Sequence, residues 1–249
     1  MDTLTTTSSS IAAAERVSAF LWKVYAWMAI GLGLTAVVAY TVASSPDVLR
    51  ALVLNRLVFF ALIIAELGLV FFISARADQL APRTAAGLFA LYSGLNGVTL
   101  SVVLMAYTGE SVTSTFIVTA GMFGALALFG STTKRSLAGV GQFMMMGLIG
   151  LILASVVGLF WQNDAMQFLI SVVGVIVFTG LTAYDAQRLK QMALVTPDGQ
   201  LAGYAIVGAL SLYLDFINLF LMLLRFMPSL TVTHDEIDEM LKLLEPCLP

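Results

Sequence analysis

The sequence predicts an all-α membrane protein, a bundle of seven spanning helices, and three observations lead to this fold class. Of the 249 residues, 59% are hydrophobic and only 11% are charged, whereas a soluble domain carries about 25% charged residues. The hydrophobic residues gather in seven runs, each near the roughly 20 residues that a helix needs to cross a bilayer. The connections between these runs are too short to fold as separate domains.

The seven runs are separated by short breaks that contain Pro, Gly, Asn or charged residues. The first run lies behind a polar segment and is longer than the apolar part of a signal peptide, so we expect it to be retained. We expect helices at residues 24–43, 57–75, 84–107, 112–130, 137–161, 166–187 and 201–227.

The chain divides into three parts. Residues 1–19 form a polar, flexible N-terminal tail, because their first part is rich in Ser and Thr and has little to bury. Residues 20–227 form the seven-helix transmembrane domain. Residues 228–249 form an acidic C-terminal tail, in which Thr233 and Glu236 have the spacing of a capping box. Apolar residues then recur at helical spacing, a pattern typical of a short amphipathic helix.

The basic residues predict the orientation, since loops on the cytoplasmic side carry an excess of Lys and Arg. With the N-terminus inside and the C-terminus outside, more of them fall on the inner side. The inner set is Arg16, Lys23, Arg76, Arg83, Lys134, Arg135, Arg188 and Lys190, and the outer set is Arg50, Arg56 and Arg225.

Several kinds of site are excluded by composition. Cys247 is the only cysteine and His234 the only histidine. An internal disulfide, a histidine-based metal site and a histidine-based catalytic triad are therefore excluded. The sequence has no basic patch with interleaved aromatic residues, so we expect no nucleic-acid partner.

Two acidic residues lie in consecutive apolar runs. Asp215 is near the middle of the last run, where an ionised side chain is costly and commonly functional. Asp185 closes the preceding run. Such acids can share one proton, because like charges a few ångströms apart cannot both ionise cheaply. The pair predicts a proton sensor or a cation site; hydropathy places Asp185 nearer the inner face, so direct contact stays open.

The last helix carries a polar stripe that must face the protein interior. At 100° per residue, Asp215 shares one face with other polar or small residues. These are Tyr204, Gly208, Ser211 and Asn218.

Two further charges need a partner. Glu66 lies near the centre of the second run, and Arg225 ends the last run. Asp215 and Arg225 are about 15 Å apart along a helix that rises 1.5 Å per residue, too far to pair. Two alternatives stay open for Arg225: an ion pair with Glu66, or a side chain that extends outward to the membrane surface.

Two segments, GLTAYD at 180–185 and LYLDFINLF at 212–220, resemble the signature of the Bax inhibitor-one family, and the similarity extends over residues 20–227. The resemblance implies a seven-helix fold with a central last helix and a pH-sensitive calcium leak, in a bacterial inner membrane. It implies that Asp185 and Asp215 bind the metal and sense pH. It also implies gating or structural roles for Glu66, Arg225 and Arg76, and supporting roles for Tyr184, Ser211, Tyr213 and Asn218.

We therefore expect a passive cation leak, with calcium as the permeant ligand, no cofactor, and the lipid bilayer as surroundings. One alternative is a regulatory protein that binds another membrane protein, such as a membrane-bound protease. A second alternative is an intramembrane aspartyl protease, since Tyr184-Asp185 fits the first half of that motif. The second half normally has glycines before its aspartate, whereas Leu212 and Leu214 precede Asp215.

Overall fold

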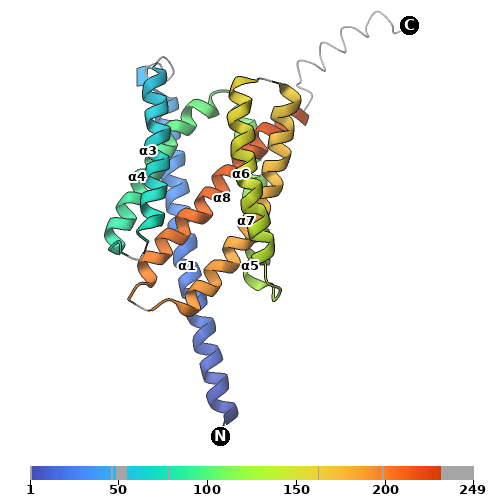
Figure 1. The fold of residues 1–249 in the computed structure, drawn as a ribbon. Helices are drawn as coiled ribbons and strands as arrows, with labels where there is room; N and C mark the ends of the chain where they lie inside the picture. The colour runs from blue at the N-terminus through green and yellow to red at the C-terminus, as the bar shows by residue number, and fades with distance from the viewer. Residues whose placement is uncertain are drawn as a thin grey trace, which may run out of the picture.

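The fold is a bundle of long helices (Figure 1). The computed structural model describes residues 2–45, 47–48, 55–77, 79–161, 163–197 and 199–230. Within these ranges, seven helices are long and apolar enough to cross a membrane, which confirms the predicted bundle. They are α1 (Asp2–Ala43), α3 (Arg56–Ala75), α4 (Pro82–Leu104), α5 (Gly109–Thr132), α6 (Ala138–Phe160), α7 (Asp164–Val195) and α8 (Leu201–Leu230).

Two helices extend beyond their apolar runs. Helix α1 begins at Asp2, which corrects the expected start at residue 24 and places helix where we expected a flexible tail over residues 1–19. Helix α7 continues to Val195, past the expected end at residue 187. Helix α8 ends at Leu230, and the amphipathic helix predicted for the C-terminal tail lies outside the described residues.

The last helix is central, as expected. In α8, 67% of an apolar stretch of 18 residues is buried inside the protein, whereas the corresponding share is 39% or less in every other spanning helix. It packs against α1, α3, α4, α5 and α7, and in Figure 1 it crosses between the pair α3–α4 and the group α5–α7. Leu212, Tyr213, Leu219 and Leu224 are fully buried although they point in different directions around the helix. A helix that is apolar on most sides is buried in this way.

Side chains with short polar groups define where several helices begin. The Asn55 and Asn163 side chains accept hydrogen bonds from the backbone N–H groups of Val58 and Ala165, at the starts of α3 and α7. Thr108 accepts one in the same way at the start of α5. The first N–H groups of a helix have no partner within it, so these caps stabilise the starts.

A close approach between α5 and α7 requires a glycine. A Cβ atom at Gly130 would lie 2.0 Å from the backbone oxygen of Ala183, two residues before Asp185. We expect Gly130→Ala to force the helices apart and to lower the free energy of unfolding by about 1–3 kcal/mol. Thermal melting in detergent measures this loss.

The control for this substitution lies on the same helix. A Cβ at Gly124 would meet nothing within 4 Å, so Gly124→Ala should keep or raise stability, since alanine favours helix by about 1 kcal/mol. Equal melting temperatures for the two variants would contradict the close packing of α5 on α7.

Candidate cation site

Helices α7 and α8 bring the two predicted acids to one place. The hydroxyl of Ser211 donates a hydrogen bond to Oδ2 of Asp185. Ser211 is one helical turn before Asp215, so it lies on the same face of α8. The two carboxyl groups are within electrostatic range of each other. Helix α7 continues ten residues past Asp185, to Val195, so Asp185 lies within the helix and can contact α8.

Asp215 is the more deeply buried of the two acids. Its side chain is 7% exposed, and its Oδ2 atom has no hydrogen-bond partner among the described residues. Nearly all buried polar atoms in proteins are hydrogen-bonded, and an unpaired one costs about 1–3 kcal/mol. A carboxyl group kept in such a position needs a reason other than stability.

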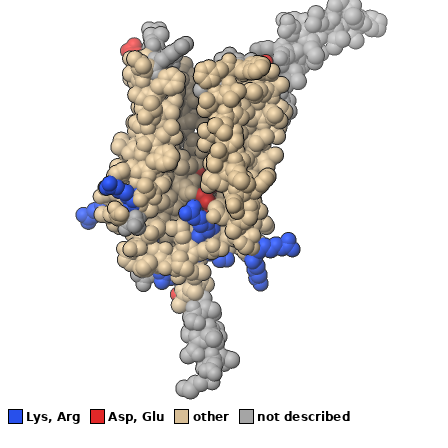
Figure 2. Space-filling view, in the orientation of Figure 1, with Lys and Arg blue, Asp and Glu red and all other residues tan. Residues whose placement is uncertain are grey.

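A cavity of about 210 Å³ leads to Asp185 from the surface. It is bounded by the end of α3, by α7 and by α8, and both Asp185 and Ser211 line it. Asp215 does not line it and lies one turn further along α8. Figure 2 shows acidic surface (red) within a groove between the two sides of the bundle, with basic surface (blue) next to it.

A basic residue that the sequence assigned only to the inner side of the membrane lines this cavity. Arg188 lines the wall and is within electrostatic range of Asp185. Arg188 is one helical turn after Asp185 on α7, and this spacing could have predicted that the two side chains lie close together.

Among the four supporting residues, the structure brings Ser211 to the acid pair. Tyr184 packs its ring against Gly141 of α6, and Tyr213 lies on another side of α8, against α1 and α4. Asn218 shares the face of Asp215, but its amide donates to the carbonyl of Leu214 in the same helix at 2.8 Å.

Glu66 has neutral partners on α4. Thr99 donates to its Oε1 atom, and the side-chain amide of Asn96 contacts Oε2 at 3.3 Å. Within the described part of the chain no ion pair joins Glu66 to Arg225, whose exposed side chain agrees with the second alternative, a side chain that extends outward. Asn96 and Thr99 were missed, although they lie three residues apart in an apolar run.

Arg76 lies beside the cavity rather than at the acid pair. It follows the last residue of α3, and its guanidinium group lies 5.1 Å from the centre of the Phe72 ring. Its neighbours Ser74 and Ala77 line the mouth of the cavity. Arg76 is therefore close in sequence to residues that line the same cavity as Asp185.

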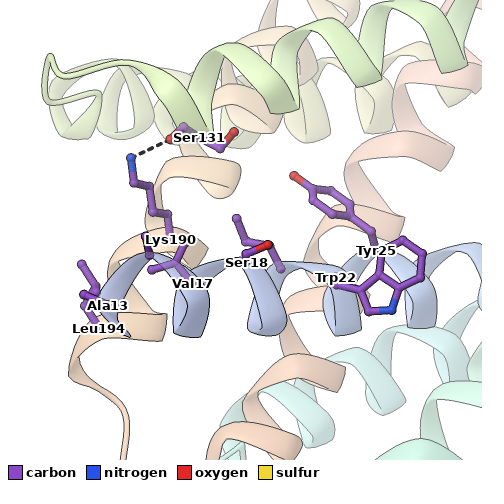
Figure 3. A pocket seen from close by; sticks show the side chains of 10 residues that line it. Ala13, Val17, Ser18, Trp22, Tyr25, Ser131, Lys190 and Leu194 are labelled. Carbon is purple, nitrogen blue, oxygen red and sulfur yellow. Dashed lines mark hydrogen bonds between the residues drawn. The ribbon is translucent and has the colours of Figure 1, made fainter. Parts of the chain in front are cut away.

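A second, larger groove lies between α1, α5 and α7 (Figure 3). Its volume is about 600 Å³, and the Lys190 ammonium group donates to the carbonyl of Ser131 at 2.7 Å. Its lining includes this lysine and no carboxylate. This groove therefore does not suit a cation.

Comparison with known proteins shows which family the chain belongs to. The family model described as "Inhibitor of apoptosis-promoting Bax1" matches residues 17–231, a range that includes both aspartates. The chain belongs to this family. This confirms the resemblance drawn from the two sequence segments, and the chain is an integral membrane protein of the Bax inhibitor family.

Several bacterial relatives are similar over nearly their whole length. "Inner membrane protein YbhL" of Escherichia coli K12 is 48% identical over 90% of this chain and 97% of its own. An uncharacterized protein of Borreliella burgdorferi is 44% identical over 84% of this chain and 90% of its own. "Uncharacterized protein RP147" of Rickettsia prowazekii is 39% identical over 90% of this chain and 95% of its own.

In this Bax inhibitor family protein the acid pair is sparse as a metal site. Among the residues that the structure describes, no group of three or more His, Cys, Asp or Glu could hold a metal ion. Two carboxylates and a hydroxyl are few ligands for calcium, which takes 6–8 oxygen atoms. An ion at this pair would keep much of its water.

Proposed function

We propose that this protein is a pH-sensitive leak for calcium, with Asp185 and Asp215 as the ion site. One observation carries the proposal: the buried Asp215 carboxyl, with an unpartnered oxygen, lies one helical turn after Ser211, which lines the same cavity as Asp185. Hard divalent cations prefer carboxylate oxygens. A site with few ligands suits permeation, since the ion must also leave.

Ser211 lines the cavity and lies one helical turn before Asp215. Its hydroxyl is bonded to Asp185, so an ion that reaches Asp185 must displace this hydrogen bond before it meets Asp215. With one proton shared by the two acids, α7 and α8 stay together. With both acids ionised, they repel each other and attract a cation. In the described arrangement the hydroxyl of Ser211 occupies Asp185, and we assign this arrangement to a closed state.

The proposed location is a bacterial inner membrane, with the N-terminus in the cytoplasm and the C-terminus outside. The cavity lies at the end of the bundle where Arg76 and Arg188 gather, and basic loops favour the cytoplasmic side. In Figure 2, the Lys and Arg side chains that are drawn in blue lie on the lower half of this face. The name of the Escherichia coli relative, an inner membrane protein, agrees with this location.

Calcium flux into liposomes tests the proposal. We expect Asp215→Asn to lower the flux about tenfold or more, the effect of losing ~1.4 kcal/mol or more of ion stabilisation. Asp164→Asn is the matched control, since Asp164 is exposed in the first turn of α7, and it should keep the wild-type flux.

Equal flux in wild type and Asp215→Asn would contradict the leak. The regulatory alternative would then gain support if deleting the segment after residue 228 abolished function in cells while Asp215→Asn did not. In that case another membrane protein, such as a membrane-bound protease, becomes the partner to identify.

A further inference from the structure

A line of polar side chains crosses the buried core on the side of α8 away from the cavity. It starts at Glu66 on α3, which is 8% exposed, and runs through Asn96 on α4 to Tyr213 on α8. The Tyr213 hydroxyl lies 3.0 Å from Oδ1 of Asn96 and 2.6 Å from Oγ1 of Thr35 on α1. Thr35 lies 2.9 Å from the backbone oxygen of Ser93.

If Glu66 is ionised, the hydrogen bonds along this line need one more hydrogen atom than its side chains can supply. Thr35 has one hydroxyl hydrogen and must give it to the Ser93 carbonyl, which can only accept. Tyr213 also has one hydrogen, yet two acceptors face it, Thr35 and the amide oxygen of Asn96. One of these two contacts would then bring oxygen against oxygen with no hydrogen between them.

Turning the Asn96 amide by half a turn does not remove the shortage while Glu66 is ionised. The amide nitrogen then donates to Tyr213, Tyr213 donates to Thr35, and Thr35 donates to the Ser93 carbonyl. The amide oxygen of Asn96, however, would face Oε2 of Glu66 at 3.3 Å, with two acceptors opposed.

A proton on Glu66 satisfies every contact. With the amide turned, Oε2–H of Glu66 donates to Asn96, and the other bonds run in one direction to Ser93, while Thr99 still donates to Oε1. We propose that Glu66 is a proton-binding site, and that its proton sets the direction of the hydrogen bonds from α3 through α4 and α8 to α1. This inference does not depend on the calcium leak.

The surroundings of Glu66 agree with a neutral carboxyl group. The titratable side chains that act on it across the packed helices are Tyr92 on α4 and Tyr213 on α8. No Lys or Arg forms an ion pair with Glu66 among the described residues. A buried carboxylate without a cation is costly, so the group keeps its proton instead.

Loss of this proton would change the hydrogen bonds that Tyr213 makes on the central helix, α8. Asn96 would have to turn back, and Tyr213 would have to give up either Asn96 or Thr35. Tyr213 stands between Ser211 and Asp215 in the sequence of α8. Glu66 is therefore linked to α8, the helix that carries Asp215, without touching either acid of the pair.

Infrared spectroscopy tests the protonation directly. The protein to use is the Asp185→Asn/Asp215→Asn variant, in which the acid pair cannot contribute a protonated carboxyl group. At neutral pH we expect a C=O band of a carboxylic acid that disappears when Glu66→Gln is added. Glu110→Gln, an exposed change in α5, should leave the band. An absent band, or one that survives Glu66→Gln, would overturn the proposal.

A second measurement uses Glu66→Gln alone, which should fold because glutamine can donate where the protonated carboxyl does. In wild type the unfolded chain releases the Glu66 proton and the folded chain keeps it, so stability falls as pH rises. Relative to Glu66→Gln, the unfolding equilibrium constant of wild type should rise up to tenfold per pH unit from about pH 5 to 8. A ratio independent of pH, or one that falls, would contradict the proposal.

Discussion

Calcium flux through the wild-type protein in liposomes is expected to rise between about pH 5 and 8, and Asp185→Asn and Asp215→Asn should each flatten this response. At the lower pH the two acids share a proton, and the helices that carry them stay together. As pH rises the shared proton leaves, and two negative carboxylates repel each other and bind calcium better. Calcium should therefore also displace the proton.

The variants separate this sensor from others. In either variant, Asp185→Asn or Asp215→Asn, a single acid remains and no longer shares a proton. The dependence of calcium flux on pH should therefore become less steep. Asp164→Asn, on the same helix as Asp185 but exposed, should reproduce the wild-type profile. If both site variants superimpose on wild type, the sensor lies elsewhere, and the buried Glu66 is the next residue to test.

The number of helices followed from the sequence because it depends on where apolar residues run, and the central position of α8 was implied by the family resemblance. The ends of α1 and α7 did not follow. Arg188 and Lys190 were taken to mark the inner end of a span, but α7 continues through them. Lys190 is stabilised there by the carbonyl of Ser131, near the end of α5. A long helix can leave the apolar layer without ending.

The acid pair was predictable because Asp215 and Ser211 share a face of one helix and Asp185 lies on the next helix. The partners of Glu66 were not predictable in this way, since the contact joins α3 to α4 across the packed core. The resemblance implied a supporting role for Tyr213 at the acid pair. A shift of two residues turns a helix by about 200°, so it faces α1 and α4 instead.

The loss of the Tyr213 ring is expected to be among the most destabilising single changes in the protein. The residue is fully buried, and its ring makes edge contacts with Phe89 and Tyr92, each at 5.7 Å between ring centres. Tyr213→Ala would leave a cavity where α8 meets α1 and α4. Removing a buried aromatic ring costs about 3–5 kcal/mol, which reversible unfolding in mixed micelles measures.

Two further variants separate the ring from the hydroxyl. Tyr213→Phe keeps the ring and removes the hydroxyl that contacts Thr35 and Asn96, so it should cost about 1–3 kcal/mol from unpaired polar groups. Tyr40→Ala removes an aromatic ring from α1 that is 77% exposed, and should change stability by less than about 0.5 kcal/mol. A Tyr213→Ala protein as stable as Tyr40→Ala would show that α8 is not held by this contact. A Phe variant as unstable as the Ala variant would show that the hydroxyl, and with it the polar line from Glu66 to Thr35, contributes more than ring packing.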